Sequence, residues 1–159
     1  GISLYAKRLA QGMAEIDEEN EYVLLQHWQE KTPLVAAPNF RRRSLFTPPH
    51  HRFEQVFLGK EINWLHVDVL HSPDFIPPFA ARCATVITVH DLAFLRYPYL
   101  LTKEAARYYA QVDKAARRVD RIIAVSESTR NDLVNMVGAP EEKISVIYEA
   151  AAPFYRPLD

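Results

Sequence analysis

Residues 121–133 read RIIAVSESTRNDL, and this stretch decides the fold because a short apolar run ends at a polar turn that begins a helix. Ile122, Ile123 and Val125 form the kind of apolar run that is typical of a strand covered on both faces. Ser126 then offers a hydroxyl that can accept hydrogen bonds from the unpaired N–H groups of the helix start. The stretch therefore predicts a buried parallel strand followed directly by a helix.

The same order of apolar run and polar turn occurs in residues 85–91, which read TVITVHD. Parallel strands end at one edge of a sheet, so we expect His90, Asp91 and Ser126 at the edge where open α/β sheets bind ligands. His90 is either a functional side chain whose tautomer or charge is set by Asp91, or a residue that only caps its strand. Ser126 meets a phosphate or a sugar hydroxyl, serves as a helix N-cap, or does both.

The composition favours one globular domain over residues 1–159. The chain has 159 residues, a formal net charge of −1 and a single cysteine. A chain of this length buries roughly 70% of its unfolded surface. A charge near zero gives no global attraction to nucleic acid, a lone cysteine forms no intrachain disulfide, and no apolar run reaches the roughly 18 residues of a membrane span. We therefore expect a cytoplasmic protein that does not bind nucleic acid.

Helical and strand periodicities alternate along the rest of the chain. Helices are expected over residues 2–16, 52–63, 105–119 and 133–137, and Gly138 stops the last of them. Strands are expected over residues 22–25, 34–36, 67–70, 85–89 and 144–147. Strands that alternate with helices predict an α/β fold with a doubly wound, mostly parallel sheet.

Residues 38–52 are rich in proline and arginine and predict a long surface loop. Within it, Arg41, Arg42 and Arg43 are either a solvated face or, with Phe46 nearby, a contact to anionic lipid or to a polyanionic acceptor. The second interpretation predicts a peripheral contact at the cytoplasmic face of a membrane.

Several other chemistries lack the residues that they need. Residues 124–128 resemble a degenerate nucleophile elbow, but such a hydrolase needs a histidine after its serine, and the last histidine here is His90. The histidines are scattered, which argues against a protein-built metal site, and four glycines provide no phosphate-binding loop. His71 ends another predicted strand before Pro73, where it is either a site residue or a turn histidine packed on the proline.

Five segments resemble, in order and spacing, the N-terminal domain of the family 4 (group 1) retaining glycosyltransferases, which have the GT-B fold. They are GISLYAKRL at 1–9, DVLHSP at 68–73, TVHDL at 88–92, VSEST at 125–129 and KISVI at 143–147. Together they extend over nearly the whole chain. The resemblance implies a Rossmann-like N-terminal domain on the acceptor side of a cleft between two domains.

The resemblance also implies an activity. A hexosyltransferase of this type moves a sugar from a nucleotide-sugar donor to an acceptor with retention, without a metal or other cofactor. This chain would need a C-terminal glycosyltransferase domain as its partner and would be inactive alone. The implied catalytic residue is His90, near the reaction centre, and the implied substrate-binding residues are Gly1, Ile2, Ser3, His71, Asp91 and Ser126.

Three features differ from the family pattern. Ser3 and Leu4 stand where the family usually has a second glycine and often an arginine. The family's Glu-x7-Glu pair belongs to the C-terminal domain, so we interpret the same spacing of Glu141 and Glu149 as coincidence. The family places a strand before the glycine loop, and we expect a second copy of the chain, a domain swap or a rearranged strand to fill that place.

Two other functions remain open from the sequence. A non-catalytic module with the same fold would present His71, His90 and the 41–43 segment to a carbohydrate or protein partner. An epimerase-type relative would also bind nucleotide sugars in the cleft of such a fold. Assays of the chain joined to a C-terminal domain discriminate among the three.

Overall fold

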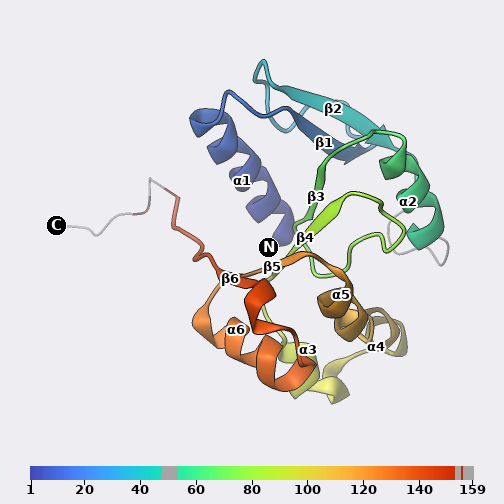
Figure 1. Cartoon of the computed structure of the whole chain (residues 1–159), viewed down its shortest axis with the longest axis vertical. Coiled ribbons are helices and arrows are strands. Elements are labelled where there is room, and N and C mark those ends of the chain that lie inside the picture. The colour runs from blue at the N-terminus through green and yellow to red at the C-terminus, as the bar shows by residue number, and fades with distance from the viewer. Residues whose placement is uncertain (48–53, 153–154, 156–159) are drawn as a thin grey trace. The chain divides into compact units, whose positions relative to one another are not determined.

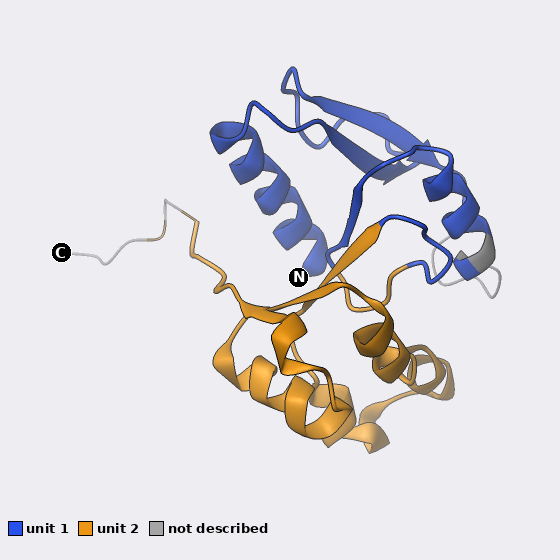
Figure 2. Cartoon of the chain, viewed as in Figure 1, with its two compact units in different colours: residues 1–73, 78–83 blue, residues 74–77, 84–159 orange. Residues whose placement is uncertain are grey.

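The computed structural model describes residues 1–47, 54–152 and 155. The chain divides into two compact units, which Figure 2 colours separately. Unit 1 comprises residues 1–73 and 78–83, and unit 2 comprises residues 74–77 and 84–159. All strand pairs described below are parallel, and helices precede, separate or connect several of the strands along the chain, which confirms the α/β class. The expectation of a single domain stays a prediction.

Unit 1 begins with a long helix and a pair of strands (Figure 1). Its elements are α1 (Ile2–Ile16), β1 (Tyr22–His27), β2 (Phe40–Leu45), α2 (Glu54–Asn63) and β3 (Val69–Ser72). β1 and β2 pair in parallel from Tyr22↔Phe40 to His27↔Leu45. The predictions of a helix over 2–16, a strand from 22 and a helix ending at 63 are confirmed.

Two predictions in unit 1 are wrong. Residues 40–45 form β2 instead of a loop, because exposed Arg41 and Arg43 alternate with half-buried neighbours and Arg42 donates through Nη2 to the His27 carbonyl at 3.4 Å. Residues 34–36 form no strand, since the backbone N–H of Leu34 donates to the side chain of buried Gln26 at 3.2 Å. The end of the predicted loop, at 48–52, lies outside the described residues.

Unit 2 is built on three short parallel strands with buried side chains. β4 (Ala84–Val89) pairs with β5 (Arg121–Ala124), and β5 pairs with β6 (Ile144–Val146). Ile87, Val89, Ile122 and Ala124, which share one face of the strands, are completely buried, and on the other face Thr88 is buried while Val86 and Ile123 are half-buried. The strands that the apolar runs predicted at 85–89, 121–125 and 144–147 are therefore confirmed.

Helical segments connect these strands. They are α3 (Ala93–Arg96), η1 (Pro98–Leu100), α4 (Lys103–Tyr109), α5 (Val112–Arg118), α6 (Glu127–Asp132), η2 (Leu133–Val137) and η3 (Glu141–Lys143). The order β4, β5, β6 advances in one direction, so right-handed crossovers place both helical connections on the same face of the strands. Figure 1 shows α4, α5 and α6 gathered there, and α5 contacts η2.

The helix predicted over 105–119 is divided. Residues 110 and 111 form a turn between α4 and α5, and the completely or almost completely buried side chains all follow that turn. They are Val112, Ala115, Ala116 and Val119. The helix predicted around 133–137 continues α6 as a wider π-type turn, and Gly138 ends it in the left-handed conformation at φ 67°, as predicted.

Candidate functional site at the ends of the buried strands

The carboxyl ends of β4 and β5 bring His90 and Ser126 into one network. Val89 is in register with Ala124, and the Val125 N–H donates to the Val89 carbonyl at 3.4 Å, which continues the pairing to the edge. His90 directly follows β4, and Ser126 begins α6 directly after β5. The structure thus places both residues at the edge where the apolar runs predicted them.

Thr129, in the first turn of α6, connects the two residues. Its Oγ1 donates to the His90 carbonyl at 3.2 Å and lies 3.0 Å from Ser126 Oγ, which accepts from the Thr129 backbone N–H at 3.1 Å. The Thr129 residue is only 6% exposed. Ser126 is therefore an N-cap, as one of the two sequence interpretations stated, and its cap fixes the backbone at His90 through Thr129.

Glu149 provides the carboxylate at the His90 ring. His90 Nδ1 and Glu149 Oε1 are 2.9 Å apart, and Glu149 follows β6. The Ile147 N–H donates to the Ala124 carbonyl at 2.9 Å, so the chain leaves β6 at the same edge. This contact was not predicted, because the spacing of Glu149 from Glu141 was interpreted as coincidence. The edge rule that found His90 and Ser126 would have found Glu149 after the predicted strand 144–147.

Asp91 and Glu141 have other partners. Asp91 Oδ1 accepts from the Ala93 N–H at 2.9 Å, which fixes the start of α3, and its side chain is exposed. The carboxylate that the structure places at the His90 ring is that of Glu149. Glu141 pairs with Arg130, so Glu141 and Glu149 do not act as a pair on one group.

The remaining predicted site residues belong to unit 1. His71 lies within β3 instead of after it, and burial lowers the pKa of its half-buried imidazole. Gly1 is the N-cap of α1, and Ile2 and Ser3 form its exposed first turn. A Cβ added at Gly1 would meet nothing within 4 Å, so the chain itself does not require glycine there.

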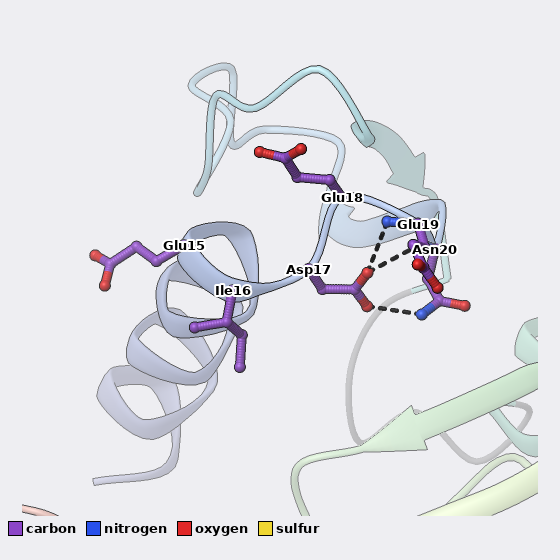
Figure 3. A pocket seen from close by; sticks show the side chains of 6 residues that line it. All are labelled: Glu15, Ile16, Asp17, Glu18, Glu19 and Asn20. Carbon is purple, nitrogen blue, oxygen red and sulfur yellow. Dashed lines mark hydrogen bonds between the residues drawn. The ribbon is translucent and has the colours of Figure 1, made fainter.

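A shallow depression in unit 1 is lined by Glu15, Ile16, Asp17, Glu18, Glu19 and Asn20 (Figure 3). Asp17 is already satisfied within its own turn, since it accepts from the Glu19 and Asn20 N–H groups and, at 2.5 Å, from the Tyr22 hydroxyl. These bonds lower the pKa of Asp17, and the carboxylate raises the pKa of Tyr22. The depression is the surface of a structural turn, and its acidic rim has no ligand-binding geometry of its own.

Within residues 1–47, 54–152 and 155, no three or more His, Cys, Asp or Glu side chains form a group that could hold a metal ion. In the same part of the chain, every helix is too short or too polar to cross a lipid bilayer.

Parallel strands whose carboxyl ends deliver His90, Ser126 and Glu149 to one edge define a Rossmann-like α/β domain. The chain belongs to glycosyltransferase family 4, whose sequence model, described as Glycosyltransferase Family 4, matches residues 1–151. The family resemblance that was based on five short segments is thereby confirmed.

A distant relative agrees with the family assignment. The chain is 21% identical over 168 residues to a protein of Methanocaldococcus jannaschii named as an uncharacterized glycosyltransferase. The match covers 97% of this chain and 43% of the relative. The chain thus spans less than half the length of the relative.

Proposed function

We propose that this chain is the N-terminal, acceptor-side domain of a retaining GT-B glycosyltransferase. The full enzyme transfers a hexosyl group from a nucleotide-sugar donor to an acceptor, and a C-terminal glycosyltransferase domain binds most of the donor. The observation that carries the proposal is the family match over residues 1–151, together with the His90 edge of the buried strands. The fraction of the relative that the chain covers fits a single domain of a two-domain enzyme.

The proposal assigns roles to the residues of this chain. His90 contacts the transferred sugar, while Asp91 and Ser126 form the surface around it. His71 and residues 1–3, which belong to unit 1, also bind substrate. Negative charge builds on the leaving phosphate during sugar transfer, and fixed donors in a site that excludes water would supply most of the rate enhancement. No metal or other cofactor takes part.

A peripheral contact with the cytoplasmic face of a membrane is part of the proposal. β2 exposes Arg41 and Arg43, and Phe46, just beyond its end, is 69% exposed. Basic side chains beside an exposed aromatic ring suit anionic headgroups. Arg42 is half-buried and bonded to the His27 carbonyl, so this contact would depend on its two neighbours.

The test compares the chain alone with the chain joined to a family 4 C-terminal domain. Both are incubated with a panel of nucleotide sugars and acceptors, and released nucleotide and glycosylated product are measured. We expect turnover only in the joined protein. NMR of the product should show the anomeric configuration of the donor, as retention requires.

Substitution at the edge separates the candidate functions. His90→Ala should lower kcat/KM by about 100-fold or more. His66→Asn is the matched control, because His66 is exposed and asparagine tolerates its φ of 51°. No turnover with any donor, together with sugar binding that depends on His90, would favour the binding module. Epimerised sugar or released nucleotide without a glycosylated acceptor would favour the epimerase-type relative.

A further inference from the structure

The turn between α3 and α4 in unit 2 exposes several large apolar side chains. Tyr97, Tyr99 and Leu100 are 49%, 78% and 73% exposed, and all five residues from 96 to 100 are exposed. The rings of Tyr97 and Tyr99 contact each other edge to face, with their centroids 6.2 Å apart. Single exposed apolar residues are common on any domain, whereas apolar side chains gathered in one place mark a site of interaction.

The turn is held in a defined conformation. The Leu100 N–H donates to the Tyr97 carbonyl at 3.1 Å, and Pro98 restricts the backbone between these two residues. Arg96, directly before the turn, pairs with Asp132 at the C-terminal end of α6. The exposed tyrosines and leucine therefore belong to an ordered part of unit 2.

Basic side chains follow the turn on the outer face of α4. Lys103 and Arg107 are four positions apart, so they lie on the same face of this helix, and both are exposed. Residues 103–121, which include α4 and α5, contain six basic and three acidic residues. Their net charge is +3, in a chain whose net charge is −1. Positive charge is thus concentrated beside the exposed apolar turn.

We propose that Tyr97, Tyr99, Leu100, Lys103 and Arg107 form a surface that binds an anionic lipid bilayer. Tyrosine and leucine side chains enter the boundary between headgroups and acyl chains, and nearby lysine and arginine side chains attract anionic headgroups. A protein partner needs about 800 Å² of matching surface on each side, whereas a fluid bilayer accepts one short apolar turn with cations beside it. This surface contains none of the residues of the membrane contact proposed for unit 1, and it does not rest on sugar transfer.

Cosedimentation with lipid vesicles tests the charged part of this surface. The chain should bind vesicles of phosphatidylcholine mixed with phosphatidylglycerol much more tightly than vesicles of phosphatidylcholine alone, and salt of about 1 M should release it. Lys103→Gln with Arg107→Gln should weaken binding by about 25-fold, since each basic residue contributes about fivefold. Lys31→Gln with Arg82→Gln is the matched control, because it removes the same charge from exposed positions of unit 1. Equal affinities of the two double variants would overturn the proposal.

Two further variants test the apolar part. Tyr99→Ser with Leu100→Ser should weaken vesicle binding by about 10-fold or more and leave the circular dichroism spectrum unchanged, because both side chains are exposed. Tyr99→Trp should show tryptophan emission that shifts to shorter wavelengths with anionic vesicles, beyond any change from Trp28 and Trp64 in the parent. No such shift, or full binding by the serine variant, would overturn the proposal. Self-association through this turn without vesicle binding would also overturn it and would assign the surface to a second copy of the chain.

Discussion

The β1–β2 pair of unit 1 and the β4–β5–β6 ladder of unit 2 share parallel pairing but differ in what surrounds them. The inward residues of β4 and β5 are completely buried, whereas in β1 and β2 only Gln26 is buried and Arg41 and Arg43 are exposed. Burial of apolar surface stabilises a fold by about 25 cal/mol per Å². It is thus the main stabilising contribution in the ladder of unit 2 and a smaller one in the strand pair of unit 1.

Polar side chains have different tasks in the two units. In unit 1 they hold turns, as when Asn39 Nδ2 donates to the carbonyls of Asp17 and Asn20 at 2.9 Å each. In unit 2, Ser126, Thr129 and Glu149 converge on His90 at the strand ends. A sheet that is stable through apolar burial can place its polar side chains where a ligand binds, whereas a half-exposed pair uses them to define its own turns.

The largest effect should come from a cavity in the ladder of unit 2. Ile122→Ala removes methyl groups from a completely buried site and should lower the free energy of unfolding by about 2–5 kcal/mol. Leu25→Ala in half-buried β1 should cost only about 1 kcal/mol. Both tryptophans, Trp28 and Trp64, belong to unit 1, so fluorescence follows that unit while circular dichroism follows the whole chain during denaturation. Equal losses in the two variants would contradict the difference in burial.

A second prediction tests whether unit 1 is tightly packed anywhere. Gly59 of α2 is buried, and a Cβ there would lie 2.6 Å from Ala80 Cβ. Gly59→Ala should therefore destabilise the chain by about 1–3 kcal/mol, although alanine favours helices. Gly12 of α1 is the matched control, since a Cβ there meets nothing within 4 Å, and Gly12→Ala should stabilise by about 0.5–1 kcal/mol. Thermal denaturation measures the stability of both variants. An increase in stability in both of them would show that α2 moves enough to accept a Cβ at position 59.

The two regions also differ in how well the sequence predicts them. The apolar runs of β4, β5 and β6 predicted both the strands and the edge at which His90 and Ser126 meet, because buried strands need continuous apolar side chains. β2 could not be found in this way. Its Arg41-Arg42-Arg43 run has no apolar period, and only the fold shows that Arg42 lies along the half-buried side and bonds to β1.

The contact between His90 and Glu149 shows a second reason why the sequence alone predicts only part of the candidate site. Asp91 is adjacent in sequence and was expected at the ring, but its carboxylate accepts from the Ala93 N–H, as aspartates in turns commonly do. Glu149 lies 59 positions from His90, and only the parallel order of β4, β5 and β6 brings it to the imidazole. Sequence proximity predicts local caps, whereas strand order determines which distant groups meet.

A third prediction separates capping from the edge network within unit 2. Ser126→Ala and Thr102→Ala each remove an N-cap, of α6 and α4, and should each cost about 1 kcal/mol. Only Ser126 also touches Thr129 Oγ1, whose other bond fixes the His90 carbonyl. Amide chemical shifts at residues 90 and 91 should therefore change in Ser126→Ala and stay constant in Thr102→Ala. Unchanged amide chemical shifts in both variants would show that Ser126 acts only as an N-cap.

The smallest effects concern two carboxylates that hold strand starts, one in each unit. The Tyr22 hydroxyl and neighbouring N–H groups lower the pKa of Asp17, and the Thr85 N–H, which donates to Asp120 at 2.7 Å, lowers the pKa of Asp120. A carboxyl whose pKa is lower in the folded state stabilises the fold above its unfolded pKa of about 3.9, and this contribution is lost as the pH falls through the folded pKa.

Asp17→Asn and Asp120→Asn should therefore each unfold slightly more readily than the parent at pH 7. The difference should begin to narrow below about pH 4, where the carboxyl of the unfolded parent gains its proton while that of the folded parent is still ionised. Glu18→Gln, at an exposed position beside Asp17, is the control and should follow the parent at every pH. Denaturation midpoints of the variants and the parent, measured from pH 7 to pH 3, test this pH dependence. A constant difference over this range would mean that the two aspartates act through their shape alone and that strand starts in both units are insensitive to charge.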